Sequence, residues 1–221
     1  MNNIIKITFP DGTEKEFSSG ITSLEIAKGI SERFAQQVLF AEVNGVQKDL
    51  SAPITKDAKI VFYKFDSDEG KELYWHSSSH VMAQAIEELY PGAKFGVGPA
   101  IDSGFYYDID SDHKFTDEDL KKIEERMLDI AKRDIQPVRE VMKRTDAIEY
   151  FKTKRKDEYK VEILETIAKD EDMVSLYHQG GFTDLCRGPH LPSTGKIKAV
   201  KLMSISGSYW RGDEKNKMLQ R

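Results

Sequence analysis

The sequence predicts an α+β protein made of two domains, a small mixed domain at residues 1–63 and a larger one at residues 71–221. Three observations lead to this prediction. Period-two apolar alternation, typical of strands, and apolar spacing of three and four residues, typical of helices, both occur in each part of the chain. A largely polar, turn-forming linker at residues 64–70 separates the two parts. No internal repeat or low-complexity tract is present.

The composition indicates a globular, water-soluble protein. Hydrophobic residues make up 39% of the 221 residues and charged residues 32%, which argues against disorder. No apolar run approaches the ~18 residues needed to span a bilayer, and the first residues lack a secretory signal pattern. We therefore expect a cytoplasmic location and no membrane partner. The single cysteine, Cys186, excludes an internal disulfide, and the net charge of −5 argues against a globally basic nucleic-acid binder.

The first domain is predicted to contain two hairpins. Apolar residues at 4–9 suggest a strand, and Asp11-Gly12 is a tight-turn signal before a return strand that begins at residues 15–17. A second hairpin is expected around Asn44-Gly45, and residues 58–63 should close the domain as a strand.

A helix should cross this sheet. Thr22 is followed three residues later by Glu25, which matches a capping box. The apolar face of this helix is formed by Leu24, Ile26, Ala27 and Ile30. Two hairpins with one helix across the sheet predict a ubiquitin-like β-grasp fold. The domain has no clustered nucleophile, base or metal-ligand set, so we interpret it as a binding or positioning module.

The second domain begins with a predicted helix and continues as a mixture of both element types. Thr116 and Asp119 cap a long amphipathic helix. Its apolar face is formed by Leu120, Ile123, Met127, Ile130 and Ala131. Further helices are expected at residues 74–89, 146–152 and 159–168, and strands at residues 95–97, 105–107, 137–143, 173–186 and 196–206.

Two short motifs contain the residues best suited to chemistry. His76 and His80 are four residues apart on a predicted helix, so both imidazoles can face one centre. This is the ligand spacing of zinc hydrolases, but Ser77 stands where those motifs carry the catalytic glutamate, so a metalloprotease is excluded. The second motif is Cys186-Arg187-Gly188-Pro189-His190, which places Cys186 and His190 in one tight loop.

These motifs together hold three of the five histidines and the only cysteine. Thiolate and imidazole are good zinc ligands, and four such groups could satisfy a tetrahedral metal. Each group alone has a structural explanation, since a lone cysteine is most often a small buried apolar residue. Their joint occurrence in two paired spacings favours a functional site. We interpret the other two histidines, His113 and His178, as structural or solvent-facing.

The motifs carry a family resemblance. A His-x-x-x-His followed much later by Cys-x-x-x-His resembles the editing domains of threonyl- and alanyl-tRNA synthetases. The segment from Phe182 to His190 looks like the threonyl version, as do residues 95–99, 104–108 and 209–213. The first domain, with Phe9-Pro10-Asp11-Gly12, resembles the TGS domain of these synthetases. The resemblance covers essentially the whole chain.

The resemblance implies a hydrolase that removes serine wrongly attached to threonine tRNA. A pocket for threonine cannot strongly reject serine, because the missing methyl is worth only ~1–3 kcal/mol of discrimination. Its expected partners are the acceptor end of tRNA(Thr), the serine moiety and the rest of a synthetase chain. The class II aminoacylation core, with its ATP motifs and anticodon-binding domain, is not in this sequence. We therefore expect a fragment of threonyl-tRNA synthetase that edits but does not activate amino acids.

The resemblance also implies roles for individual residues. His76 and Lys160 match positions that the family uses for chemistry, with Lys160 acting on water or on the developing oxyanion. We expect the remaining catalytic-site residues to shape the pocket and hold waters and the substrate amine; they are His80, Cys186 and His190. Tyr107 and Asp184 are expected to bind substrate, Tyr107 as a wall and Asp184 as an orienting group or a partner of the serine ammonium.

Cofactor and RNA contacts complete the expectations. Ligand spacing favours zinc at the His and Cys motifs, but the threonyl family is understood to edit without one, so we predict no required metal. The densest basic run, at residues 152–156, is predicted to contact RNA, and Lys132, Arg133, Arg139, Lys143 and Arg144 add to it. Two alternatives remain open at this stage. One is a regulatory RNA-binding module, and the other is a free-standing zinc hydrolase acting on a small substrate.

Overall fold

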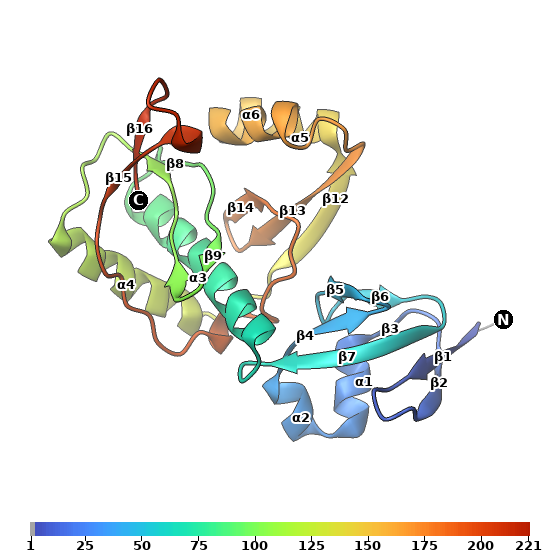
Figure 1. The fold of residues 1–221 in the computed structure, drawn as a ribbon. Coiled ribbons are helices and arrows are strands. Elements are labelled where there is room, and N and C mark those ends of the chain that lie inside the picture. Colours follow the sequence, from blue (N-terminus) through green and yellow to red (C-terminus); the bar gives the residue numbers. More distant parts are fainter. Residues whose placement is uncertain (1–2) are drawn as a thin grey trace. The chain divides into compact units, whose positions relative to one another are not determined.

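The computed structural model describes residues 3–221 (Figure 1). The chain forms two compact units, and each is described by itself. One unit contains the residues up to Tyr74 together with Gly188–Pro192, and the other contains Trp75–Arg187 and Ser193–Arg221. None of the described helices is long and apolar enough to cross a membrane.

The first unit is a five-stranded sheet in the order β2-β1-β7-β4-β5. Strands β1 and β7 are parallel, and the other neighbours are antiparallel. A short β3–β6 pair lies apart from this sheet. The elements are β1 (Ile4–Thr8), β2 (Glu14–Ser18), β3 (Ile21–Thr22), α1 (Ser23–Ile30), α2 (Glu32–Gln37), β4 (Val38–Val43), β5 (Val46–Lys48), β6 (Pro53–Ile54) and β7 (Ala58–Lys64).

The core of this unit forms where α1 covers the sheet. Ile5 and Ile7 of β1 are buried while Ile4 is exposed, because alternate side chains of a strand point to opposite faces. They pack in one cluster with Ile26 of α1 and Ile60 of β7. The hairpins and the crossing helix confirm the β-grasp expectation.

Helix starts in this unit follow side-chain caps. The predicted capping box is present, since the Glu25 amide donates to Thr22 Oγ1 at 3.2 Å and the Thr22 amide donates to Glu25 Oε2 at 2.8 Å. Sequence analysis missed helix α2. Ser31 caps it by accepting a hydrogen bond from the Phe34 amide at 3.0 Å.

The second unit contains two main sheets, in the orders β15-β16-β11-β8 and β12-β13-β14, and a small β9–β10 hairpin. Its strands are β8 (Lys94–Phe95), β9 (Ala100–Ile101), β10 (Gly104–Phe105), β11 (Ile109–Asp110), β12 (Val138–Lys143), β13 (Met173–Gln179), β14 (Phe182–Leu185), β15 (Gly207–Tyr209) and β16 (Met218–Gln220). Its helices are α3 (Asp68–Leu89), which belongs to this unit from Trp75 onward, α4 (Asp117–Lys132), α5 (Arg144–Tyr150) and α6 (Glu158–Thr166), with a π-helix at Phe151–Arg155 and 3₁₀ turns at Thr194–Lys196 and Trp210–Gly212.

Helix α3 is the longest element, with 22 residues, and it begins at Asp68 instead of the expected Tyr74. The segment expected to be a linker therefore includes the first helical turn. Ser67 explains the early start, because its Oγ accepts a hydrogen bond from the Gly70 amide at 3.0 Å.

Helix α4 lies beside α3 (Figure 1). Its predicted capping box is present at Thr116 and Asp119, and Ile123, Met127 and Ile130 of the predicted apolar face are buried. Arg126 of α4 and Arg133, which directly follows α4, both donate to the Glu88 carboxylate of α3.

Residues 196–206 do not form the expected strand. The Glu124 side chain of α4 binds this segment where a strand partner would otherwise do so. It accepts hydrogen bonds from the Leu202 amide at 2.6 Å and from Lys201 Nζ. The expected strand at residues 173–186 is divided into β13 and β14 by a turn at Gly180-Gly181. The fold class, a β-grasp domain followed by a larger α+β region, is confirmed.

Candidate functional site

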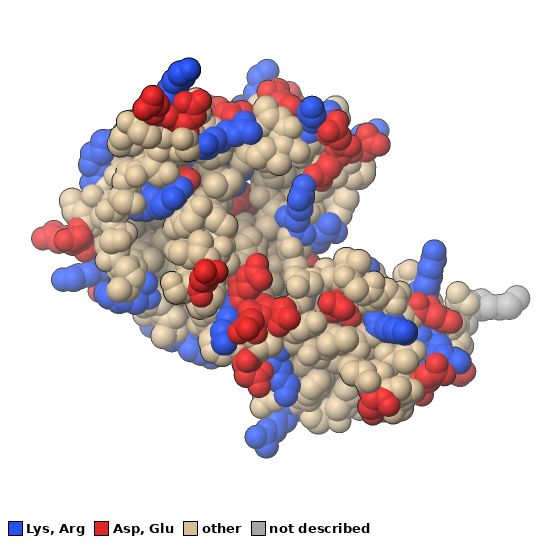
Figure 2. Space-filling model, viewed as in Figure 1, with Lys and Arg blue, Asp and Glu red and all other residues tan. Residues whose placement is uncertain are grey.

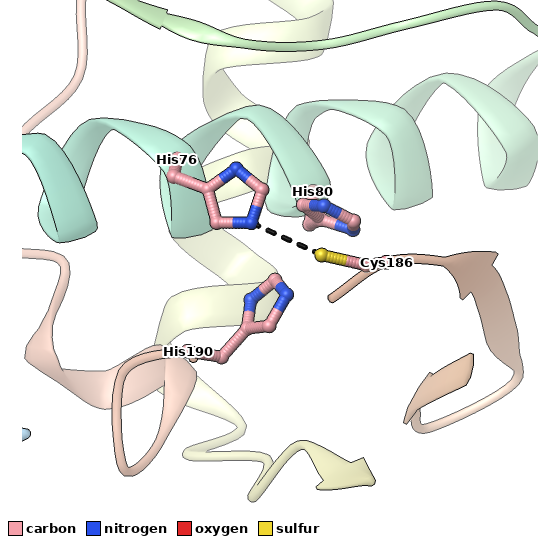
Figure 3. Close-up of side chains that lie close together, drawn as sticks. All are labelled: His76, His80, Cys186 and His190. Carbon is pink, nitrogen blue, oxygen red and sulfur yellow. Dashed lines mark hydrogen bonds between the residues drawn. The ribbon is translucent and has the colours of Figure 1, made fainter. Parts of the chain in front are cut away.

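Helix α3 presents His76 and His80 on one face, as their spacing predicts (Figure 3). The ring centroids are 4.8 Å apart, and the ring planes meet at 76°. Ser79, between them in sequence, is fully buried and donates its hydroxyl to Gly98 O at 2.8 Å. This bond joins the histidine-bearing turn of α3 to the loop after β8.

Cys186 directly follows β14 and its sulfur lies beside the histidines (Figure 3). The Cys186 amide donates to Ser175 O at 3.1 Å, and Ser175 Oγ donates to Cys186 O at 2.6 Å. These two bonds fix the backbone on β13. The Sγ atom lies 3.2 Å from His76 Nε2.

His190 completes a set of four possible metal ligands. One ligand atom from each of His76, His80, Cys186 and His190 lies within 4.8 Å of the other three. The His190 amide donates to Asp49 Oδ1 at 2.8 Å. After the loop, Thr194 is anchored by bonds to Ile135 and Ile130.

This cluster fits zinc and corrects the prediction that no metal is required. Three imidazoles and a thiolate are a zinc-type donor set, and separations of this size let one ion approach all four atoms. His80 Nδ1 lies 3.3 Å from Asp184 Oδ2, so a carboxylate orients this imidazole in the way usual for histidine ligands of zinc. The expectation of a metal-free site is wrong because it followed the family resemblance against the ligand spacing.

The two histidines of α3 are held in the neutral form that binds metal. Burial lowers the pKa of His76 and, more strongly, that of His80. The positive charge of nearby Lys160 lowers both further. At neutral pH the contact between His80 Nδ1 and Asp184 Oδ2 therefore joins a neutral imidazole to a carboxylate and is not an ion pair.

Asp184 is the centre of a buried polar network beside the cluster. Lys160 Nζ lies 2.6 Å from Oδ1, and Tyr107 Oη donates to Oδ2 at 2.5 Å. The Leu185 amide also donates to Oδ1, at 2.8 Å. Lys160, Tyr107 and Asp184 are each less than 5% exposed. The ammonium thus compensates the buried carboxylate, which would be costly to bury alone.

Tyr107 and Lys160 complete this network. Burial and the negative charge of Asp184 raise the pKa of Tyr107 well above its usual value, so its hydroxyl stays protonated and acts as a donor. Lys160 Nζ donates to Gly96 O at 2.9 Å and to Tyr107 Oη at 3.1 Å. All three donor positions of the ammonium therefore have partners.

Asp157 positions Lys160 and was missed by sequence analysis. It caps α6 by accepting hydrogen bonds from the Tyr159 and Lys160 amides, and its Oδ2 accepts one from the Phe95 amide at 3.0 Å. Burial raises the pKa of Asp157, although Lys160 and the backbone donors lower it. An aspartate just before a helical run is an N-cap signal that could have identified it.

The seven residues selected from the sequence meet in one place. His76, His80, Cys186 and His190 form the donor cluster, and Lys160, Tyr107 and Asp184 join it through His80. The other two histidines are structural. His113 stacks on Tyr90 and bonds to Asp119, and His178 bonds to Glu140 and Thr183.

The predicted basic run is only partly available for RNA. Lys152, Lys154 and Lys156 are exposed, but Arg155 is paired with Glu87. Among the added residues, Arg133 binds Glu88 and Arg144 binds the Glu171 and Leu164 carbonyls. Basic and acidic side chains are interspersed over the face drawn in Figure 2.

Family models match both parts of the chain. The TGS domain matches residues 5–64, and the "Threonyl and Alanyl tRNA synthetase second additional domain" matches residues 174–221.

The chain is also similar to curated threonine--tRNA ligases. It is 60% identical to that of Pelodictyon phaeoclathratiforme over 99% of its length, and 58% identical to that of Chlorobaculum tepidum over 97%. It is 56% identical to that of Chloroherpeton thalassium over its whole length. In each case it spans 33% of the relative. The chain therefore belongs to the threonyl-tRNA synthetase family, of which it represents the N-terminal TGS and second additional domain region.

Proposed function

We propose that the chain hydrolyses the ester that joins serine to mischarged tRNA(Thr), in the cytoplasm and as the editing part of a threonyl-tRNA synthetase. The observation that carries this proposal is the cluster of seven polar residues, buried or half-buried, in which the four donor residues lie beside the Lys160–Asp184 ion pair. Such a cluster is expensive to bury, and a purely structural domain would gain more from an apolar core.

Ester hydrolysis requires charge stabilisation at the carbonyl oxygen and a route for protons. Lys160 meets the first requirement as a fixed positive charge and not as a direct hydrogen-bond donor, because its three N–H groups already have partners that hold it in place. Tyr107 keeps its proton, because its pKa is raised, and donates a hydrogen bond to the Asp184 carboxylate that also contacts Lys160. Asp184 orients both groups.

The four donor residues have a different role in this proposal. His76, His80, Cys186 and His190 would hold the metal, and His76 would then act as a ligand instead of handling the ribose hydroxyl. Four protein ligands fill a tetrahedral site, so zinc bound there would act on the ester as a Lewis acid only by expanding its coordination to a fifth position. Asp184 supports both parts of the site, because it contacts His80 through one oxygen and Lys160 through the other.

Selection between serine and threonine is the second part of the proposal. The site must admit the smaller side chain and exclude one additional methyl. A rigid wall suits that task, and Tyr107 provides one because its ring is buried and its hydroxyl is fixed.

The test is hydrolysis by the purified chain of seryl-tRNA(Thr) and threonyl-tRNA(Thr), measured in single turnover at saturating protein. We expect fast release of serine and little release of threonine. Equal hydrolysis of both esters would contradict the selection. Tight tRNA binding with neither ester hydrolysed would indicate an RNA-binding module instead.

A further inference from the structure

An ion pair connects the elements that carry the site residues. Arg155 is the last residue of the π-helix that precedes α6, and it binds Glu87 of α3 through two guanidinium nitrogens. The bond from Nη1 to Oε1 is 3.1 Å. The Arg155 side chain is 21% exposed and that of Glu87 26%, so both are largely shielded from water. A bidentate, shielded pair holds geometry better than an exposed one.

The two partners lie close in sequence to site residues. Glu87 is two helical turns after His80 on α3. Arg155 is five residues before Lys160, and Lys156 between them has a left-handed backbone with φ of 52°. Asp157 then ties the start of α6 to Phe95. Lys160 therefore follows two successive anchors, one to α3 and one to the β8 strand.

Arg155 also covers the strand that carries Asp184. Its guanidinium carbon lies 5.7 Å from the centroid of the Phe182 ring. Phe182 and Asp184 are two residues apart on β14, so their side chains lie on the same face of the strand. The Phe182 ring is 2% exposed and lies 6.5 Å from the His80 ring, centroid to centroid.

We propose that the Glu87–Arg155 pair is a positioning device that sets Lys160 and Asp184 relative to His76 and His80. Neither residue contacts the reacting atoms. The pair links three parts of the site. Glu87 is part of α3, which carries His76 and His80, and Arg155 is part of the segment that leads to Lys160. The Arg155 guanidinium also contacts the Phe182 ring on β14. This inference deepens the proposed function and rests on it for its kinetic consequences.

The adjacent Glu88 provides a matched control. It lies next to Glu87 on α3 and also binds two arginines, but Arg126 lies on α4 and Arg133 is the residue that directly follows α4, and neither segment carries a site residue. Glu88→Gln removes a comparable amount of charge pairing from the same helical turn. It should therefore reproduce any general loss of stability without moving Lys160.

The experiment compares Arg155→Met, Arg155→Lys, Glu87→Gln and Glu88→Gln in the whole chain. The first readout is acetylation of Lys160 by acetic anhydride, followed by mass spectrometry without substrate. Lys160 should be protected from acetylation in the wild type and in Glu88→Gln. It should also stay protected in the wild type at a raised temperature below the melting transition. It should label several-fold faster in Arg155→Met and Glu87→Gln. Arg155→Lys should label at an intermediate rate, because lysine keeps the charge but not the planar fork.

The second readout is single-turnover hydrolysis of seryl-tRNA(Thr). We expect Arg155→Met and Glu87→Gln to lower the saturated rate roughly 10- to 100-fold, as small misplacements of catalytic groups do, with little change in binding of a seryl-adenosine analogue. An inactive wild type with the expected labelling pattern would refute the proposed hydrolysis and leave the positioning intact. Unchanged labelling in Arg155→Met and Glu87→Gln, or equal change in Glu88→Gln, would overturn the positioning inference.

Discussion

Lys160 and Asp184 show what the site requires of single residues. Each is almost completely buried, and each carries a charge whose desolvation the other offsets. Removing one partner leaves a bare charge in the interior, which typically costs about 3–5 kcal/mol of folding free energy. A mutation at either position therefore changes both the free energy of unfolding and the rate of hydrolysis. The two effects must be measured separately.

Lys160→Met is predicted to lower both stability and rate. The free energy of unfolding should fall by about 3–5 kcal/mol because Asp184 loses its counter-charge. The deacylation rate should fall on the order of 10²–10³-fold, as is typical when a preorganised charged group is removed. The double variant Lys160→Met/Asp184→Asn should regain most of the stability and none of the rate. Urea unfolding and single-turnover hydrolysis measure the two quantities, and a double variant with wild-type rate would remove Lys160 from the mechanism.

Gly98 is predicted to be irreplaceable because of Tyr107. A Cβ atom at Gly98 would overlap the Tyr107 ring, so the ring or the loop must move. Gly98→Ala should cost about 1–3 kcal/mol, as overpacking usually does, and should slow deacylation. Gly29→Ala in α1 is the control, since a Cβ there meets no atom within 4 Å and the helix should gain about 1 kcal/mol. Equal thermal stability of the two variants would contradict the close-approach argument.

Zinc content provides a test of the donor cluster. The purified chain should contain one zinc ion, and chelation should lower its melting temperature, because an ion bound only by the folded state stabilises it. Cys186→Ser and His80→Ala should lose the metal. His178→Ala should retain it, because His178 bonds to Glu140 and Thr183 outside the cluster. Metal analysis of all four proteins decides the point, and equal zinc in every variant would exclude this site.

The identities of the site residues were accessible from the sequence to different degrees. Histidine and cysteine are scarce here, so their paired spacings stand out. Lysine and aspartate are abundant, and nothing local distinguishes Lys160 or Asp184 from solvated residues; only the family resemblance selected them. Glu87 and Arg155 could not be found at all, because an ion pair between residues 68 positions apart leaves no local pattern.

At the scale of elements, the helix starts show where sequence reasoning is reliable. A capping box is a local pattern, and both predicted boxes are present in the structure. Strands depend on distant partners, so residues 196–206 carried a strand pattern but were tied to Glu124 instead. The division of residues 151–157 into a π-helix and a left-handed turn follows from tertiary anchors and has no sequence signature.

The start of α4 predicts a pH dependence of stability. Hydrogen bonds from His113, Tyr90 and Thr116 hold the pKa of Asp119 well below its usual value. A carboxylate with a depressed folded-state pKa contributes stability that is present above its unfolded pKa of about 3.9 and is lost as the pH falls below it. Wild-type stability should therefore decline more steeply between neutral pH and pH ~3 than that of Asp119→Asn. Urea unfolding across this range measures the difference, and parallel curves would contradict the assignment.

At the scale of the whole molecule, charge distribution limits how RNA can bind. The net charge is −5, and on the face drawn in Figure 2 the lysines and arginines are interspersed with acids. Binding of tRNA must then use local groups, and Lys152, Lys154 and Lys156 are the exposed members of the basic run.

Lys154→Ala is predicted to weaken tRNA binding and to reduce the slope of log K against log salt by about 1, as loss of one phosphate contact does. The single-turnover rate at saturation should not change. Lys169→Ala, at another exposed lysine of the same unit, is the control and should leave the slope unaltered. Filter binding over a range of salt concentrations measures the slope, and identical slopes for the two variants would argue against contact at the run.

The strand order β15-β16-β11-β8 has a consequence for biosynthesis. Strand β16 lies between β15 and β11, and Arg221 just after it binds Asp108 just before β11, a partner 113 residues earlier in the sequence. During translation, the edge of β11 that pairs with β16 therefore stays unpaired until β16 has been synthesised. Until then, the backbone groups along that edge of β11 have no strand partner in the nascent second unit.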